Sequence, residues 1–511
     1  MKRSEKKNAA HQKLRTRQKA EGMVAAQKPT ASNAKSAYKT VEEEQEAREE
    51  AAVAQIRMLR AKLPFLLLRL SKIPDYRSPK KIKHKLTVVL IYGILMFVYQ
   101  MASRREANRE MTRPAFEKSL SLIFPDLENL PHHDTLNRIL SNIDVNLIEE
   151  THIDLIRKFI RQKKFARYLI DNIYPIAIDG TQKVVRGDIL SEEWLQRKVG
   201  TGKKDKDKSE GKDGDGDDDI QKRQYYIYVL EANLVFQNGM VLPLLSEFLV
   251  YSEGDTSNDK QDCETNAFYR LAKRLKKQFS HLPVMVFLDG LYATGPVMDI
   301  CRNNNWQFMI VLKDKSLPTV WEEFYGLKQL EKNNRFAMKW GNRKQLFEWI
   351  NNIHYYYGEN QKKRLTVHVV VCKETWEEID PETCEPVTMT SRHAWLSSHP
   401  INKTNVHKRC NLGARHRWGI ESSILVEKRQ GYYYEHLFSH DWNAIKGFHF
   451  LMRLAHLLNV LTQFSTALIK TVKNLGVRGF IDFLRSTMAG PWLDSEKVRP
   501  RLEAPFQLRL D

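Results

Sequence analysis

Two short apolar segments of this 511-residue chain each end in an aspartate followed by a glycine. The first is YPIAIDG, residues 174–180, and the second is VMVFLDG, residues 284–290. Apolar runs of this length predict buried β-strands, and the glycine after each aspartate predicts that the chain turns there. The sequence therefore places two carboxylates, Asp179 and Asp289, at the ends of two core strands.

The residues around these two segments predict the rest of one sheet. A Gln-Asn-Gly turn at 237–239 separates two strand-like runs, 224–236 and 240–251, which is typical of a hairpin. A helix is expected over about 259–279 and a further strand over 306–312. The predicted class is α/β, and the element order resembles that of ribonuclease-H-like folds, in which a mixed sheet is flanked by helices.

A third carboxylate lies on a predicted helix over 416–432, HRWGIESSILVEKRQGY. Offsets of four and eleven residues place Arg417, Glu421 and Lys428 within about 40° of one another on an α-helix. A carboxylate between two cations suits a site that holds both a metal ion and phosphates. The alternative is a solvated face with an ordinary i,i+4 ion pair, just as Asp179 and Asp289 can serve only to form turns.

These acids, in this order, make the chain resemble the DDE transposases of bacterial insertion sequences, in particular the IS-four type. In that group the third-acid helix carries Tyr-x-x-Arg-x-x-x-Glu-x-x-x-x-x-x-Lys. Arg417, Glu421 and Lys428 fit this pattern, whereas Ala414 stands at the position of the Tyr. The resemblance covers roughly residues 75–464 and includes a β-rich insertion before the Glu helix, here 313–403.

The resemblance implies a DNA transposase that cleaves the element ends, exposes a 3′ hydroxyl and joins it to target DNA. Asp179, Asp289 and Glu421 would bind two Mg²⁺ ions, with Mn²⁺ as a substitute, because hard cations prefer oxygen ligands. Arg417 and Lys428 would hold phosphates, and Trp418 belongs with them to the expected DNA-binding residues. Two alternatives remain open: a nuclease without strand transfer, and a domesticated transposase-derived protein that only binds DNA.

Charge and cysteine content agree with a nucleic-acid partner. The chain has 82 Lys and Arg against 62 Asp and Glu, a net charge of +20 that favours a polyanion. Its five cysteines show neither zinc-ligand nor disulfide spacing. The apolar stretch 86–102 is expected to be a buried helix and not a membrane span. We expect double-stranded DNA as partner, both terminal inverted repeats and target, a homodimer in the synaptic complex, no membrane, and a bacterial cytoplasmic, nucleoid-associated location.

Changes in composition along the chain predict six regions. Residues 1–40 form a basic arm that is disordered when free, and 41–165 form a helical DNA-binding domain. In that domain a helix within 131–144 carries Asn137 and Arg138, either as the recognition element of a helix-turn-helix or as a packing helix. The catalytic core begins at 166–312, with a charged flexible loop at 200–219, and continues after the β-rich insertion (313–403) with the third-acid helix (404–432). Residues 433–511 form a helical region.

Overall fold

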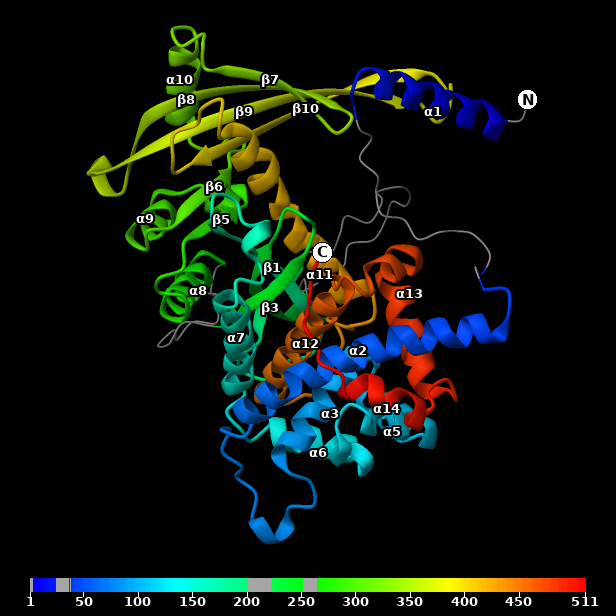
Figure 1. Cartoon of the computed structure of the whole chain (residues 1–511). Helices are drawn as coiled ribbons and strands as arrows, with labels where there is room; N and C mark the ends of the chain where they lie inside the picture. The colour runs from blue at the N-terminus through cyan, green and yellow to red at the C-terminus, as the bar shows by residue number, and fades with distance from the viewer. Residues whose placement is uncertain (1–2, 24–35, 37, 200–221, 251–263) are drawn as a thin grey trace, which may run out of the picture.

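The computed structural model describes residues 3–23, 36, 38–199, 222–250 and 264–511 (Figure 1). Its centre is one ten-stranded mixed sheet in the order β2-β3-β1-β5-β6-β10-β9-β8-β7, with β4 paired to β3. Helices flank the sheet, and the N-terminal region is helical. The predicted fold class is confirmed, because this architecture is consistent with a ribonuclease-H-like fold. The strands are β1 (Tyr174–Arg186), β2 (Leu195–Val199), β3 (Lys222–Val235), β4 (Val241–Phe248), β5 (Val284–Leu288), β6 (Gln307–Val311), β7 (Arg335–Trp340), β8 (Arg343–Tyr357), β9 (Lys363–Ile379) and β10 (Pro386–Ser397).

The helices form a bundle below the sheet in Figure 1, together with layers on the sheet itself. Helices α7, α8 and α12 pack on β4, whereas α11 packs on β1 and β3. They are α1 (Arg3–Ala20), α2 (Val41–Leu70), α3 (Leu86–Val98), α4 (Arg104–Met111), α5 (Pro114–Ser121), α6 (His133–Leu140), α7 (Asn146–Arg161), α8 (Glu264–Gln278), α9 (Gly295–Asn303), α10 (Pro318–Lys328), α11 (Trp418–Arg429), α12 (Trp442–Gln463), α13 (Ile469–Ala489) and α14 (Ser495–Glu503).

The most apolar helix is buried inside the protein. Every residue of α3 except Thr87 is buried, and the helix packs against α12. Among the described residues, no helix is both long enough and apolar enough to cross a membrane.

The N-terminal segment differs from the disordered arm that its composition predicted. Residues 3–20 form α1, which lies along the projecting β-hairpins in Figure 1. Leu14 is buried, the Arg3 guanidinium donates to the Pro381 carbonyl at 3.2 Å, and Arg17 pairs with Glu377. The burial of Leu14 and the pairing of Arg17 with Glu377 of β9 give this basic segment a surface on which to order. The charged loop predicted at 200–219 lies outside the described residues.

The β-rich segment is continuous with the central sheet. Strand β10 pairs with β6 in antiparallel register, with Trp395 opposite Val311. Strands β9, β8 and β7 then extend the same sheet outwards. Strands β7 to β10 are therefore an extension of the central sheet, the β-extension, and its base lies beside the strand that follows the second aspartate.

Strand register places both aspartates on the same face of the sheet. Ala177 of β1 pairs with Phe287 of β5 in parallel register, and the two aspartates lie two residues beyond these partners. Side chains two residues apart on a strand share a face. Ala177 and Phe287 pack in one apolar cluster with Ile420 and Ile424 of α11. The third-acid helix therefore covers the face on which Asp179 and Asp289 lie.

A buried ionic network joins this helix to the sheet. Arg453 of α12 donates to Glu427 of α11 at 2.9 Å and pairs with Glu231 of β3 at 3.1 Å. Both carboxylates are fully buried, and Arg453 is 2 % exposed. Glu231 is the cross-strand partner of Asp179, so it lies on the same face of the sheet. Arg453 therefore fixes the position of α11 relative to the strand that carries the first aspartate.

We predict that Arg453→Ala lowers the free energy of unfolding by about 3–5 kcal/mol, because it leaves two buried carboxylates without their cation. Chemical denaturation of the purified variant measures the change. The matched control is Arg478→Ala, which removes an Arg whose side chain is 66 % exposed and whose ion pair is on the surface. This variant should lower the free energy of unfolding by less than about 0.5 kcal/mol. Equal losses in the two variants would contradict the role given to Arg453.

Candidate active site

The three predicted acids lie around one arginine. The Arg417 guanidinium contacts Glu421 at 2.7 Å and Asp179 at 3.8 Å. Its charge also acts on Asp289, which receives a hydrogen bond from the Lys313 ammonium at 3.0 Å. The structure thus brings together carboxylates that are separated by 110 and 132 positions in the sequence.

Each acid keeps part of its surface open to solvent. The carboxylate side chains of Asp179, Asp289 and Glu421 are 21 %, 31 % and 37 % exposed, whereas that of Arg417 is only 5 % exposed. An ion can therefore approach the oxygens from solvent while Arg417 stays behind them. The Nε and Nη1 donors of Arg417 are buried and have no hydrogen-bond partner among the described residues. Nη1 faces Asp179 at 3.8 Å, so a phosphate oxygen can reach these donors only when the guanidinium or the carboxylates move.

The two aspartates have opposite pKa shifts. Burial raises the pKa of Asp179 to about 6 against the attraction of Arg417, and the charges of Glu421 and Glu264 add to the rise. Burial also favours the protonated form of Asp289. There, however, the hydrogen bonds from Lys313 and the Gly290 backbone hold the pKa below its ordinary value. A bound cation would therefore lower the pKa of Asp179 more than that of Asp289.

The chain does not turn after Asp179 as predicted. Strand β1 continues to Arg186, and Gly180 lies within it. A Cβ at this position would lie 2.6 Å from the Tyr228 ring and 2.7 Å from Glu264, so glycine is needed for close packing and not for a turn. The prediction is right for Asp289, because Gly290 begins a short 3₁₀ turn directly after β5.

The third-acid helix is shorter than the predicted range 416–432. A π-helical turn (His407–Gly413) and a 3₁₀ turn (Ala414–Arg417) precede α11, which begins at Trp418. Arg417 is therefore the N-cap residue, although its i,i+4 pair with Glu421 still forms. The position where the family pattern has Tyr falls in the 3₁₀ turn, and Ala414 is buried there.

A pocket of about 700 Å³ is lined by one of the acids, Asp289, together with Lys313 and Arg417. Residues 392–395, at the base of the β-extension, also line it. Its aromatic members are Trp340, Trp395 and Trp418, and its other cations are Arg392 and Arg415. Aromatic rings between cations can stack on bases and hold a phosphate backbone.

Glu374 of β9 connects this pocket to the third-acid segment. It is 1 % exposed and accepts hydrogen bonds from Arg343, Arg415 and Gln345. Burial raises the pKa of the Glu374 carboxyl, but the nearby His393 ring and then Gln345, Arg415 and Arg343 hold it well below its ordinary value. The β-extension thereby orients Arg415, two residues before Arg417.

The remaining predicted residues lie in different places. Trp418 is 61 % exposed in the pocket just described. Lys428 donates to the Gln182 carbonyl at 2.8 Å and pairs with Glu435 at 3.1 Å, so it ties α11 to β1. Asn137 and Arg138 are on α6, in the helical region below the sheet (Figure 1). These two residues do not contribute to the acid site.

Sequence reasoning missed Lys313 and Glu264. Lys313 follows β6, which runs parallel to β5, so its place at the same edge as Asp289 follows from strand order. Glu264 begins α8 and accepts hydrogen bonds from the Tyr228 and Tyr292 hydroxyls. No sequence pattern marks Glu264, because its partners come from two distant segments.

The donor set fits a hard divalent cation. Asp179, Asp289 and Glu421 offer only carboxylate oxygens, which are the ligands that Mg²⁺ prefers in proteins. No histidine or cysteine takes part in the contacts around Arg417 that the structure describes. Burial is the main cause of the raised pKa of Asp179, and Glu421 and Glu264 add to it, so a bound cation would favour the charged carboxylate.

Comparison with known proteins links the chain to transposases. The family model described as DDE_Tnp_1-associated matches residues 67–156, which extend from the end of α2 into α7. No curated protein matches the chain. The matched region indicates an association with the DDE family of transposases. It lies before all three acids, so it does not reach the residues that would distinguish the IS-four type.

The pKa of Asp179 gives a testable pH dependence. Because its folded-state pKa of about 6 exceeds the ordinary 3.8, the folded protein binds more protons than the unfolded chain between these values. The stabilising effect is complete below pH 3.8 and is lost as the pH rises through 6, by about 3 kcal/mol for a shift of about two pH units. We expect Asp179→Asn to remove this part of the pH dependence of unfolding in metal-free protein. An unchanged profile would show that the carboxyl is not desolvated.

Proposed function

We propose that this chain is a metal-dependent DNA transposase of the DDE class. The observation that carries the proposal is the meeting of Asp179, Asp289 and Glu421 around Arg417, beside a pocket of aromatic and cationic side chains. The transposase-associated family match in the helical region supports the same class. The similar family pattern of the third-acid helix supports the finer assignment to the IS-four type.

In this proposal the three carboxylates hold two Mg²⁺ ions, for which Mn²⁺ can substitute. The ions, when bound, activate the attacking water or 3′ hydroxyl and stabilise the departing oxygen. Arg417 neutralises part of the charge of the carboxylates in the free protein. When metal ions neutralise the carboxylates instead, the guanidinium is released to donate to a phosphate oxygen. Lys313 and Lys428 add positive charge at the two ends of the site.

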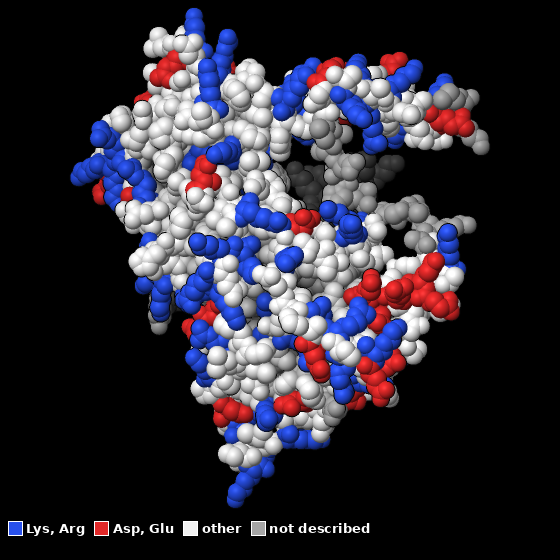
Figure 2. All heavy atoms as spheres, in the orientation of Figure 1, with Lys and Arg blue, Asp and Glu red and all other residues white. Residues whose placement is uncertain are grey.

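The pocket beside the acids would hold the DNA strand that reacts. Trp418, which is 61 % exposed, offers a face for a base, whereas Trp395 is only 4 % exposed and packs in an apolar cluster. Arg392 and Arg415 line the same pocket and supply positive charge for the backbone. Figure 2 shows Lys and Arg spread over much of the visible face, with acidic side chains gathered at the start of α2. The partners we propose are the terminal inverted repeats and target DNA, bound by a homodimer in the synaptic complex.

The central test uses the acids themselves. We expect Asp179→Asn, Asp289→Asn and Glu421→Gln each to abolish cleavage in Mg²⁺ while leaving DNA affinity nearly unchanged, because the acids bind metal and not the duplex. The substrate is a duplex carrying the ends of the genomic segment that encodes the chain, and the assay scores both cleavage and joining. Asp482→Asn, on α13, is the control and should remain active. Cleavage at the wild-type rate by any acid variant would remove that residue from the site.

A second prediction concerns Arg417. If its free donors contact a phosphate, Arg417→Gln should lower the slope of log affinity against log salt by about one unit, since each contact releases roughly one counterion. Arg429→Gln changes a residue of the same helix whose side chain is 69 % exposed, and it serves as the charge-matched control. An unchanged slope in correctly folded Arg417→Gln protein would leave Arg417 only a structural partner of Glu421.

A further inference from the structure

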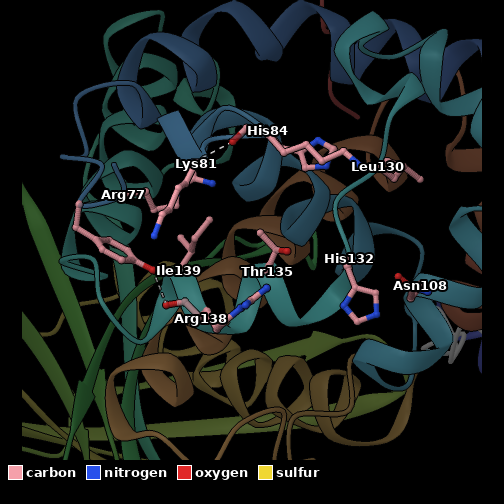
Figure 3. Close-up of a pocket in the computed structure, with 11 residues that line it drawn as sticks. Arg77, Lys81, His84, Asn108, Leu130, His132, Thr135, Arg138 and Ile139 are labelled. Atoms are coloured by element: carbon pink, nitrogen blue, oxygen red, sulfur yellow. Dashed lines mark hydrogen bonds between the residues drawn. The ribbon is translucent and has the colours of Figure 1, made fainter. Parts of the chain in front are cut away.

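A second basic pocket lies in the helical region, away from the acids. It has a volume of about 530 Å³ and opens between the segment 76–84 and helix α6. Figure 3 shows side chains of that segment on one side and those of α6 on the other. The segment contains a short 3₁₀ turn, Pro79–Lys81, and forms the lowest point of the molecule in Figures 1 and 2.

Only one sign of charge lines this pocket. Four cations, Arg77, Lys81, Lys83 and Arg138, line it, and no described carboxylate does. Lys81, Lys83 and Arg138 form no ion pair with any residue that the structure describes. Such an arrangement is unfavourable unless an anion joins it, because like charges repel across the pocket.

Neighbouring acids neutralise only part of this charge. Asp75 pairs with Arg77 at 2.7 Å, and Asp134 lies 3.7 Å from the His132 ring and 3.2 Å from Arg104. Lys81, Lys83 and Arg138 keep no carboxylate partner among the described residues. The lowered pKa of the His84 side chain agrees with this, since burial is the main cause and the charges of Lys83 and Arg77 add to it.

The hydrogen bonds that stabilise the walls of the pocket do not involve the charged groups of Lys81, Lys83 and Arg138. Arg77 donates to Asp75 at 2.9 and 2.7 Å and to the His84 carbonyl at 3.0 Å, which closes the segment on itself. The Tyr76 hydroxyl donates to the Arg138 carbonyl at 3.1 Å, which ties the segment to α6. Dashed lines in Figure 3 mark the bonds to His84 and Arg138. The two lysines and the Arg138 guanidinium are thus presented on a fixed frame.

We propose that this pocket binds phosphate groups of the DNA backbone, and that Lys81, Lys83 and Arg138 anchor a duplex without reading its sequence. The inference rests on the proposed function, because it takes DNA as the polyanion. It also changes the expectation for α6. Arg138 is grouped with lysines of another segment around a shared pocket, an arrangement suited to backbone phosphates and not to base edges.

The test compares two charge-matched triple variants of the full chain. One is Lys81→Ala/Lys83→Ala/Arg138→Ala, and the control is Lys470→Ala/Lys473→Ala/Arg499→Ala on α13 and α14. Fluorescence anisotropy measures binding to a short random-sequence duplex over a range of salt concentrations. We expect the pocket variant to lower the slope of log affinity against log salt by about two to three units, with little change in the control. Thermal unfolding should match wild type, because the three side chains are on the surface.

The outcomes separate this inference from the proposed function. Equal loss of affinity for random duplex and for the element ends supports backbone binding, whether or not the wild-type protein cleaves DNA. A loss confined to the element ends would instead indicate base reading by α6 and would overturn the inference. It is also overturned if the salt slope of the pocket variant equals that of wild type or of the control, or if the wild-type protein binds no duplex. Failure of cleavage with an altered slope would count only against the proposed function.

Discussion

The arrangement of the candidate site depends on one buried cation. Arg453 lies between Glu231, beside Asp179 on the sheet, and Glu427, six residues after Glu421 on α11. Further donors complete the network, since the Tyr434 and Ser246 hydroxyls donate to Glu231. Buried ions tolerate few alternative geometries, because any shift that breaks a pair exposes an uncompensated charge to a low-dielectric interior. This contact therefore fixes α11 more strictly than the apolar packing of Ile420 and Ile424 alone would.

The β-extension acts on the same helix from the other end. Glu374 holds Arg415 within the 3₁₀ turn that ends at Arg417, while Arg453 holds Glu427, ten residues after Arg417. The segment that carries Glu421 is thus anchored on both sides by buried carboxylates. Glu374 belongs to the β-extension, whereas Arg453 belongs to α12. The position of Glu421 therefore depends on how both the β-extension and α12 pack on the central sheet.

The sequence predicted those features that depend on local patterns. The strand that carries Asp179, the strand that Asp289 follows, the mixed sheet and a helix containing Glu421 follow from apolar runs and spacing. The end of the first strand at Asp179 was predicted wrongly, because β1 continues to Arg186. The role of Gly180 could not be predicted, because it depends on Tyr228 and Glu264 from other elements. The break before α11 and the ordering of α1 also depend on tertiary contacts, which override local preference. The proximity of Asp179 and Asp289 can be predicted only when the pairing register of β1 and β5 is known. Neither strand sequence alone determines that register.

The position of α12 in the chain has a consequence for synthesis. All three acids are present once residue 421 has been made, yet Arg453 follows 32 positions later. A nascent chain or a truncated product that ends between them carries the full set of carboxylates without the cation that holds their helix. We expect such fragments to be unable to fix α11 on the sheet. The proposed cleavage activity would then be confined to chains whose translation has passed α12.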